Sequence, residues 1–192
     1  MTLWFLARAA GFVALLCASL TVALGAAGSS GRRDGRILAH LVHRSAAVVT
    51  LAMLALHAVL LITDHFVDVS LSGALVPFTA GYRAFALGLG TLAVYAFVVV
   101  AATGAARGRL AASAGAARAW RGVHLAAYAA WALAMAHGVL AGTDTFRGWA
   151  LSLYGLAAFV VASAVTGRIA VEARWRRAPL ARTRRALTGA VR

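Results

Sequence analysis

Four histidines lie within two long apolar stretches of this sequence, where an imidazole side chain needs a partner. His43 and His57 are fourteen residues apart in one stretch. His124 and His137 are thirteen residues apart in the other. Ionisable residues at membrane depth are costly and are candidates for function. Because two neutral imidazoles on opposite helices can supply both axial iron ligands of a b-type haem, the sequence predicts two haem b sites. A set of hydrogen-bonded structural histidines is the alternative.

The spacing places one imidazole of each stretch in each leaflet. Fourteen residues of α-helix rise roughly 21 Å and return to within about 40° of the starting face. Thirteen residues leave the side chain about 140° away, so the helix between His124 and His137 must tighten toward 3₁₀ geometry or receive its two haems from different sides. We expect His43 to face His124 and His57 to face His137. Pairs about 20 Å apart cannot share one zinc or copper ion.

Arginines border both predicted sites and are candidates for binding haem propionates through charge-assisted hydrogen bonds. Those near the inner pair are Arg44, Arg118 and Arg121. Those near the outer pair are Arg8, Arg83 and Arg147. A plain interfacial anchor is the alternative for each of them.

Two further histidines lie close to the predicted ligands. His40 precedes His43 by one helical turn and is an alternative inner ligand. His65 follows the stretch that carries His57 and lies beside two aspartates, where we expect a solvated or acceptor-side position rather than a haem ligand.

The composition is that of an integral membrane protein. Of 192 residues, 62% are hydrophobic and only 12% are charged, and the mean hydropathy is +0.84. A net charge of +14 would indicate nucleic acid in a soluble protein, but all 19 basic residues are arginines, and most of them lie between and after the apolar runs. We therefore expect them to set membrane topology, with no nucleic-acid partner. A single cysteine, Cys17, excludes an internal disulfide and a multi-cysteine metal site.

Five apolar runs are long enough to cross a hydrocarbon core of about 30 Å, and the predicted fold is an all-α bundle of five transmembrane helices. The runs are Leu3–Ala26, Ile37–Thr63, Ala84–Thr103, Trp120–Ala141 and Trp149–Gly167. For the first run, a cleaved signal peptide is the alternative.

The connecting segments set the expected orientation. Gly104–Ala119 has no periodic apolar face and is predicted to be a loop. Most arginines lie in this segment, in the turn before Ile37 and in the final 25 residues. By the positive-inside tendency these parts are cytoplasmic, which places the N-terminus outside and the C-terminus in the cytoplasm.

Two histidine motifs resemble those of the ferric reductase-like transmembrane domain family, which includes the membrane parts of NADPH oxidases and ferric reductases. The first is His43-Arg44 followed by His57, and the second is Trp120-Arg121-Gly122-Val123-His124 followed by Tyr128 and His137-Gly138. The resemblance covers about Leu3 to Arg168. It implies a haem-binding transmembrane domain over residues 1–168 and a basic cytoplasmic tail over 169–192, in a bacterial cytoplasmic membrane.

The resemblance also implies a direction of electron transfer. Electrons would enter from a cytoplasmic donor at the inner haem and leave through the outer haem to an acceptor outside. Family members commonly have six spans, and the oxidases and reductases continue into a flavin and nicotinamide domain that this sequence lacks. A separate flavoprotein or a membrane quinol is therefore the expected donor.

Two other functions compete with a ferric reductase-like oxidoreductase component. One is a non-catalytic cytochrome b subunit that anchors and relays electrons for a partner oxidoreductase. The other is a haem-free helical scaffold or transporter. The sequence has no P-loop, no credible Ser/His/Asp arrangement and no paired carboxylates at membrane depth, so hydrolytic chemistry has no candidate residues.

Overall fold

The computed structural model describes residues 2–27, 33–64 and 69–189, and within these ranges the chain is helical without any strand. This confirms the predicted all-α class. Five helices are long and apolar enough to span a membrane. They are α1 (Thr2–Ala27), α2 (Arg33–Thr63), α4 (Ala84–Ala105), α6 (Ala114–Ala141) and α7 (Gly148–Gly189).

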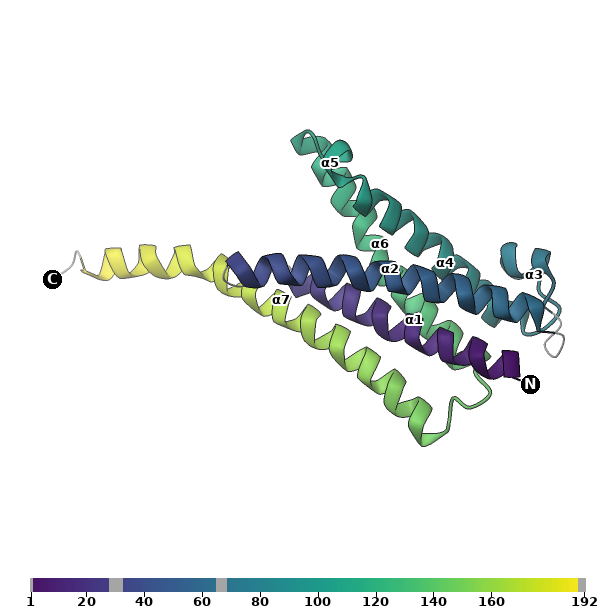
Figure 1. Ribbon diagram of the computed structural model, residues 1–192. Helices are drawn as coiled ribbons and strands as arrows, with labels where there is room; N and C mark the ends of the chain where they lie inside the picture. The colour runs from purple at the N-terminus through teal and green to yellow at the C-terminus, as the bar shows by residue number, and fades with distance from the viewer. Residues whose placement is uncertain (1, 28–32, 65–68, 190–192) are drawn as a thin grey trace.

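The long helices form two antiparallel pairs with a fifth helix alongside. Helix α2 packs along α1, α6 packs along α4, and α7 packs on another side of α1 (Figure 1). Two short helices, α3 (Leu71–Leu75) and α5 (Arg107–Leu110), lie at opposite ends of the bundle (Figure 1). Small side chains at Ala10, Ala14 and Ala18 are buried along α1, which allows its neighbours to approach closely.

The segment predicted to be a loop, Gly104–Ala119, is largely helical. It ends α4, forms α5 and begins α6 at Ala114. The side chain of Ser113 accepts a hydrogen bond from the amide of Ala116 at 3.2 Å, which is an N-cap contact. Alanine has the highest helix propensity, so this alanine-rich sequence forms helix without the apolar periodicity on which the prediction depended.

Helix α7 continues past the expected domain boundary at residue 168 without a break. Its 42 residues correspond to about 63 Å at roughly 1.5 Å per residue, about twice the thickness of a hydrocarbon core. The C-terminal part extends beyond the rest of the bundle (Figure 1). Arg168 pairs with Glu172 one turn later, at 3.0 Å. The division into a 1–168 domain and a 169–192 tail stays a prediction.

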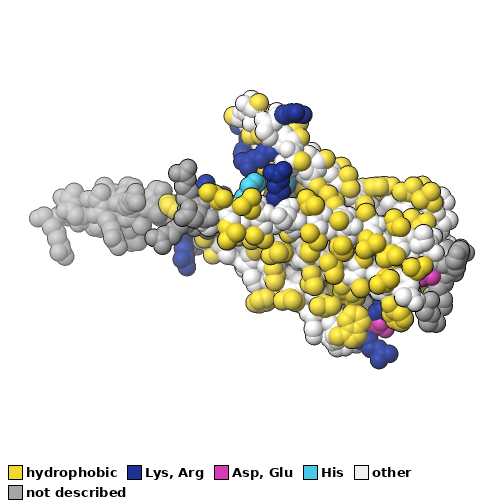
Figure 2. All heavy atoms as spheres, in the orientation of Figure 1, with side chains coloured by type: hydrophobic (Ala, Val, Ile, Leu, Met, Phe, Trp, Pro, Cys, Tyr) yellow, Lys and Arg dark blue, Asp and Glu magenta, His cyan; other side chains and the backbone are white. Residues whose placement is uncertain are grey.

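The two ends of the bundle differ in charge and are called here the arginine-rich end and the N-terminal end. The arginine-rich end carries exposed arginine side chains, namely Arg36, Arg44, Arg107, Arg109, Arg118, Arg121 and Arg168. The N-terminal end carries Arg8, Arg83, Asp144 and Arg147. Between the ends, hydrophobic side chains cover the visible face of the bundle (Figure 2). Large apolar residues such as Phe159 and Val48 are more than 60% exposed, which is typical of a surface that faces lipid.

Candidate functional site

The four histidines of α2 and α6 form two facing pairs. The ring centroids of His43 and His124 are 6.3 Å apart, with the ring planes inclined by 53°. Those of His57 and His137 are 6.2 Å apart, with an inclination of 79°. When two imidazoles bind one metal ion from opposite sides, each ligating nitrogen lies about 2.0 Å from the ion and roughly 1.1 Å from its own ring centroid. The two ring centroids are then roughly 6.2 Å apart. Both pairs therefore have the separation of two ligands on opposite sides of one ion.

Three of these imidazoles are fixed by backbone carbonyls of the helix packed beside them. The distance from Nδ1 of His43 to the carbonyl oxygen of Thr21 is 2.8 Å. Nδ1 of His57 lies 2.7 Å from the carbonyl oxygen of Ala7. A carbonyl can only accept, so each Nδ1 donates its proton and Nε2 keeps a free lone pair.

The third bond joins the other helix pair. Nδ1 of His137 donates to the carbonyl oxygen of Ala86 at 2.8 Å. Metal-ligating histidines ordinarily donate their second ring nitrogen in this way, which fixes the ring orientation and strengthens the ligand. The arrangement leaves Nε2 as the nitrogen available to a metal.

Glycines make room for the rings at these carbonyls. On α1, a Cβ at Gly11 would lie 3.1 Å from His57, and one at Gly25 would lie 3.4 Å from His43. Each glycine is four residues after the carbonyl that accepts the histidine bond, so its own amide donates to the same oxygen within the helix. With no side chain there, the imidazole can reach that oxygen.

Helix α4 repeats the arrangement. A Cβ at Gly90 would lie 2.7 Å from Nδ1 of His137, and one at Gly104 would lie 3.4 Å from His124. The four glycines were not predicted as site residues. A signal existed, because Gly11 and Gly25, like Gly90 and Gly104, are fourteen residues apart and so match the spacing of His43 and His57.

The thirteen-residue spacing is accommodated without any change of helix type. Helix α6 is α-helical throughout Ala114–Ala141, so of the two predicted alternatives the local tightening toward 3₁₀ geometry is absent from it. The difference appears instead in the side chains. His137 makes its carbonyl bond, whereas Nδ1 of His124 lies beside the carbonyl of Val100 without reaching ordinary hydrogen-bond geometry.

A largely apolar cavity surrounds the pair at the N-terminal end. Its volume is about 140 Å³, smaller than the roughly 300–1,000 Å³ common for small-molecule and cofactor sites. His57, His137 and Gly11 line it together with Leu15, Leu54 and Phe97. The cavity is therefore apolar and lies against both imidazoles, and a cofactor between them would have to widen it.

The helices that carry the histidines do not hold each other in place. Over their described residues, α2 and α6 are not among the helix pairs that pack closely, whereas α2 packs on α1 and α6 packs on α4. The opposed imidazoles are therefore carried by different helix pairs, which contact each other through α1 with α6 and α2 with α4. This is the arrangement that a flat ligand between two axial nitrogens requires.

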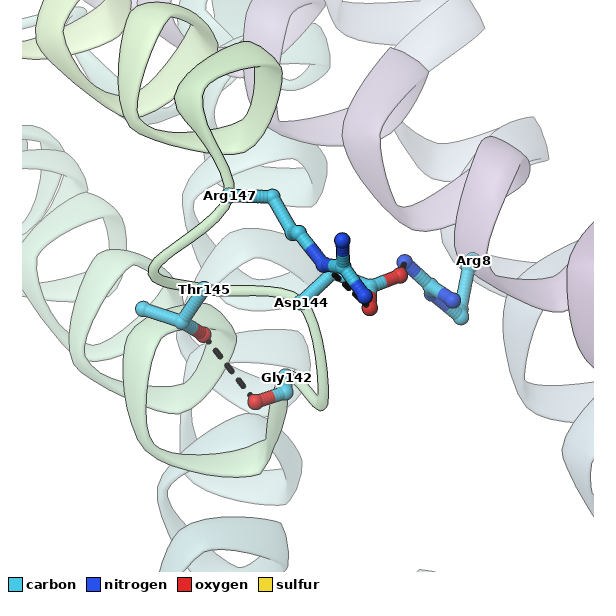
Figure 3. A network of polar contacts seen from close by, with 5 residues as sticks. All are labelled: Arg8, Gly142, Asp144, Thr145 and Arg147. Carbon is cyan, nitrogen blue, oxygen red and sulfur yellow. Dashed lines mark hydrogen bonds and ion pairs between the residues drawn. The ribbon is translucent and has the colours of Figure 1, made fainter.

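An ion-pair network closes the N-terminal end of the cavity. Arg8 of α1 pairs with Asp144 of the α6–α7 loop, and Arg147 lies 4.0 Å from the same carboxylate (Figure 3). The guanidinium of Arg8 lies 5.9 Å from the ring centroid of Trp4 and 5.7 Å from that of Trp149. The loop itself is held by Thr145, whose hydroxyl donates to the carbonyls of Gly142 and Val139.

We expect the Arg8–Asp144 pair to stabilise the bundle measurably. Its side chains are only 17% and 29% exposed, so removing either partner leaves a poorly solvated charge. Arg8→Met and Asp144→Asn should each lower the free energy of unfolding by about 1–3 kcal/mol. The double variant should lose less than the sum, as measured by thermal unfolding in detergent.

Arg147→Met is the matched control for that measurement. Its side chain is 75% exposed and lies farther from Asp144, so the expected change is within about 0.5 kcal/mol. Equal losses for Arg8→Met and Arg147→Met would contradict the role given to Arg8.

The remaining predicted site residues lie as follows. His40 is exposed and His43 faces His124, so the structure favours His43 over His40 in that pair.

Arg83 donates to the carbonyl of Leu140 at the end of α6, at 2.8 Å. His65 and its neighbour Asp68 lie outside the described residues. The predicted propionate partners Arg44, Arg118 and Arg121 are exposed at the arginine-rich end.

Among the described residues, no group of three or more His, Cys, Asp or Glu side chains lies together as in a conventional protein-only metal site. A two-imidazole site needs only its two ligands. Comparisons with family models, with curated proteins and with solved structures found no match to this chain.

Proposed function

We propose that this chain binds two b-type haems between α2 and α6 and transfers electrons across a membrane. The observation that carries the proposal is the pair of opposed imidazoles at each end of the bundle, with ring centroids 6.3 and 6.2 Å apart. His43 and His124 would hold one haem, and His57 and His137 the other. The resemblance to the ferric reductase-like transmembrane domain family agrees with this assignment and stays a prediction.

Some residues of this chain would bind the haem iron, and others orient those ligands. Carbonyls on α1 and α4 fix three of the imidazoles with Nε2 available, and glycines beside those carbonyls admit the rings. A haem held by two imidazoles supplies one-electron transfer, since both axial positions of its iron are filled. Arg44 and Arg121 would bind propionates at the arginine-rich end through charge-assisted hydrogen bonds.

The proposed direction follows from charge. The arginine-rich end would be cytoplasmic by the positive-inside tendency, with the N-terminus outside, in a bacterial cytoplasmic membrane. Histidines fourteen residues apart on α2 are separated by roughly 21 Å along the helix axis, which covers much of a hydrocarbon core of about 30 Å. A cytoplasmic flavoprotein or a membrane quinol would donate electrons, and an acceptor outside would receive them.

A relay subunit for a partner oxidoreductase is the second candidate. It is favoured by the pairing of all four imidazoles inside the bundle, since a site with two protein ligands offers the iron no position for a substrate. The purified protein with a generic reductant would reduce an added ferric chelate if it acts as a reductase by itself. A pure relay subunit would not.

The test of the proposal is an optical spectrum of the purified protein in detergent, with haem counted per chain. We expect a reduced b-type band and two haems per chain. Absence of the band would overturn the proposal, and a count of one would overturn its two-site form.

A further inference from the structure

His124 differs from the other three histidines in what holds its ring. The equivalent carbonyl on α4 belongs to Val100, but Nδ1 of His124 is buried and makes no hydrogen bond of normal geometry with it. One imidazole is thus oriented by a weaker backbone contact than the other three.

An aromatic ring adds to that contact. The indole of Trp120, one turn earlier on α6, lies 4.9 Å from the His124 ring with the planes inclined by only 19°. Its Nε1 donates to the carbonyl of Thr103 at 3.0 Å, which ties the indole to α4. On α5, the guanidinium of Arg107 lies 5.0 Å from the indole centroid. Trp120 is thereby fixed by three elements of the arginine-rich end.

We propose that Trp120 is the positioning residue of the His43–His124 site, and that its stacked indole completes the orientation of His124, which a carbonyl holds less firmly than it does the other three histidines. This inference rests on the proposed haem-binding function. A tryptophan at a membrane interface is often only an anchor. The indole here is partly buried, gives its single donor to a protein carbonyl and lies nearly parallel to the imidazole, and an anchor requires none of these contacts.

The two haem sites would therefore differ in the contacts that orient their histidine ligands. A ligand whose second-nitrogen hydrogen bond is weak is less well oriented and less basic, so its site relies more on packing. Loss of the Trp120 ring should therefore release the haem at the arginine-rich end selectively. The site at the N-terminal end keeps both carbonyl bonds and should be unaffected.

The experiment compares Trp120→Leu with Trp120→Phe in the full chain, purified in detergent. Haem per chain is counted, and the low-spin electron paramagnetic resonance signals of the oxidised protein are recorded. His57→Ala, which removes a ligand of the other site, identifies which signal belongs to the arginine-rich end. Trp175→Leu is the control, because this tryptophan of α7 is 74% exposed.

We expect Trp120→Leu to lower the haem count from two to one, with loss of the signal that His57→Ala retains. Trp120→Phe keeps a ring that can stack and should retain two haems while shifting that same signal. If Trp120→Leu does not accumulate, Trp120→Phe decides by itself, since a shift confined to that signal supports the inference and two unmoved signals overturn it.

Failure of the inference and failure of the proposed function are distinguishable. A wild-type protein without haem refutes the function before any variant is made. Two haems with unchanged signals in Trp120→Leu refute only the role of Trp120. Equal effects of Trp120→Leu and Trp175→Leu would do the same.

Discussion

Replacing His57 with alanine is expected to lower the haem content of the purified protein from two per chain to one. His137 would then be the one histidine left among the described residues that line the cavity. The other pair lies roughly 21 Å away along α2 and should keep its haem. The reduced b-type band should fall to about half of its wild-type intensity per chain, assuming similar band strengths for two bis-imidazole haems.

His40→Ala is the control for this prediction. It removes a histidine from the same helix, but one that is exposed and does not face α6. We expect two haems and an unchanged spectrum. If His40→Ala lowered the count and His57→Ala did not, the ligand assignment on α2 would be wrong.

Gly90→Ala is expected to have the second-largest effect, on stability and on the His57–His137 site together. A Cβ at this position would lie 2.7 Å from Nδ1 of His137 and 2.9 Å from Cε1 and Cγ. The ring must move away, and its bond to the carbonyl of Ala86 breaks. Overpacking and the loss of a buried hydrogen bond should together lower the free energy of unfolding by about 2–4 kcal/mol. Haem content should fall toward one per chain.

The other glycines provide a graded comparison. Gly11→Ala, with a contact of 3.1 Å to His57, should have a smaller effect, and Gly25→Ala, at 3.4 Å from His43, a smaller one still. Gly122 of α6 has nothing within 4 Å of the added atom. Alanine is there expected to stabilise the helix by about 0.5–1 kcal/mol, so Gly122→Ala should raise the unfolding temperature. Equal losses at Gly90 and Gly122 would show that the glycines do not act through the histidine rings.

The spanning helices could be predicted from sequence because the bilayer imposes a length on apolar runs. Predicted and observed ends agree within two residues at Leu3–Ala26 and at Ala84–Thr103. The start of α6 was placed six residues late, since alanine promotes helix without contributing strong hydrophobicity. The orientation of the bundle in a membrane stays a prediction.

The site could be predicted only in part. Helical spacing correctly suggested that His43 faces His124 and that His57 faces His137. It could not show which imidazole would have the weakest carbonyl contact, because that depends on where α4 lies beside α6. The pairing of Arg8 with Asp144 joins residues 136 positions apart, and no local pattern encodes it.

The separation of the opposed imidazoles is a property of helices that contain no histidine. Helix α1 packs against both α2 and α6, and α4 packs mainly against α6. Evolutionary constraint on this separation should therefore fall on small buried residues of α1, such as Ala14 and Ala18, as strongly as on the ligands. Among homologous chains, we expect a change of side-chain size at these positions of α1 to go with a change in the imidazole separation at both sites.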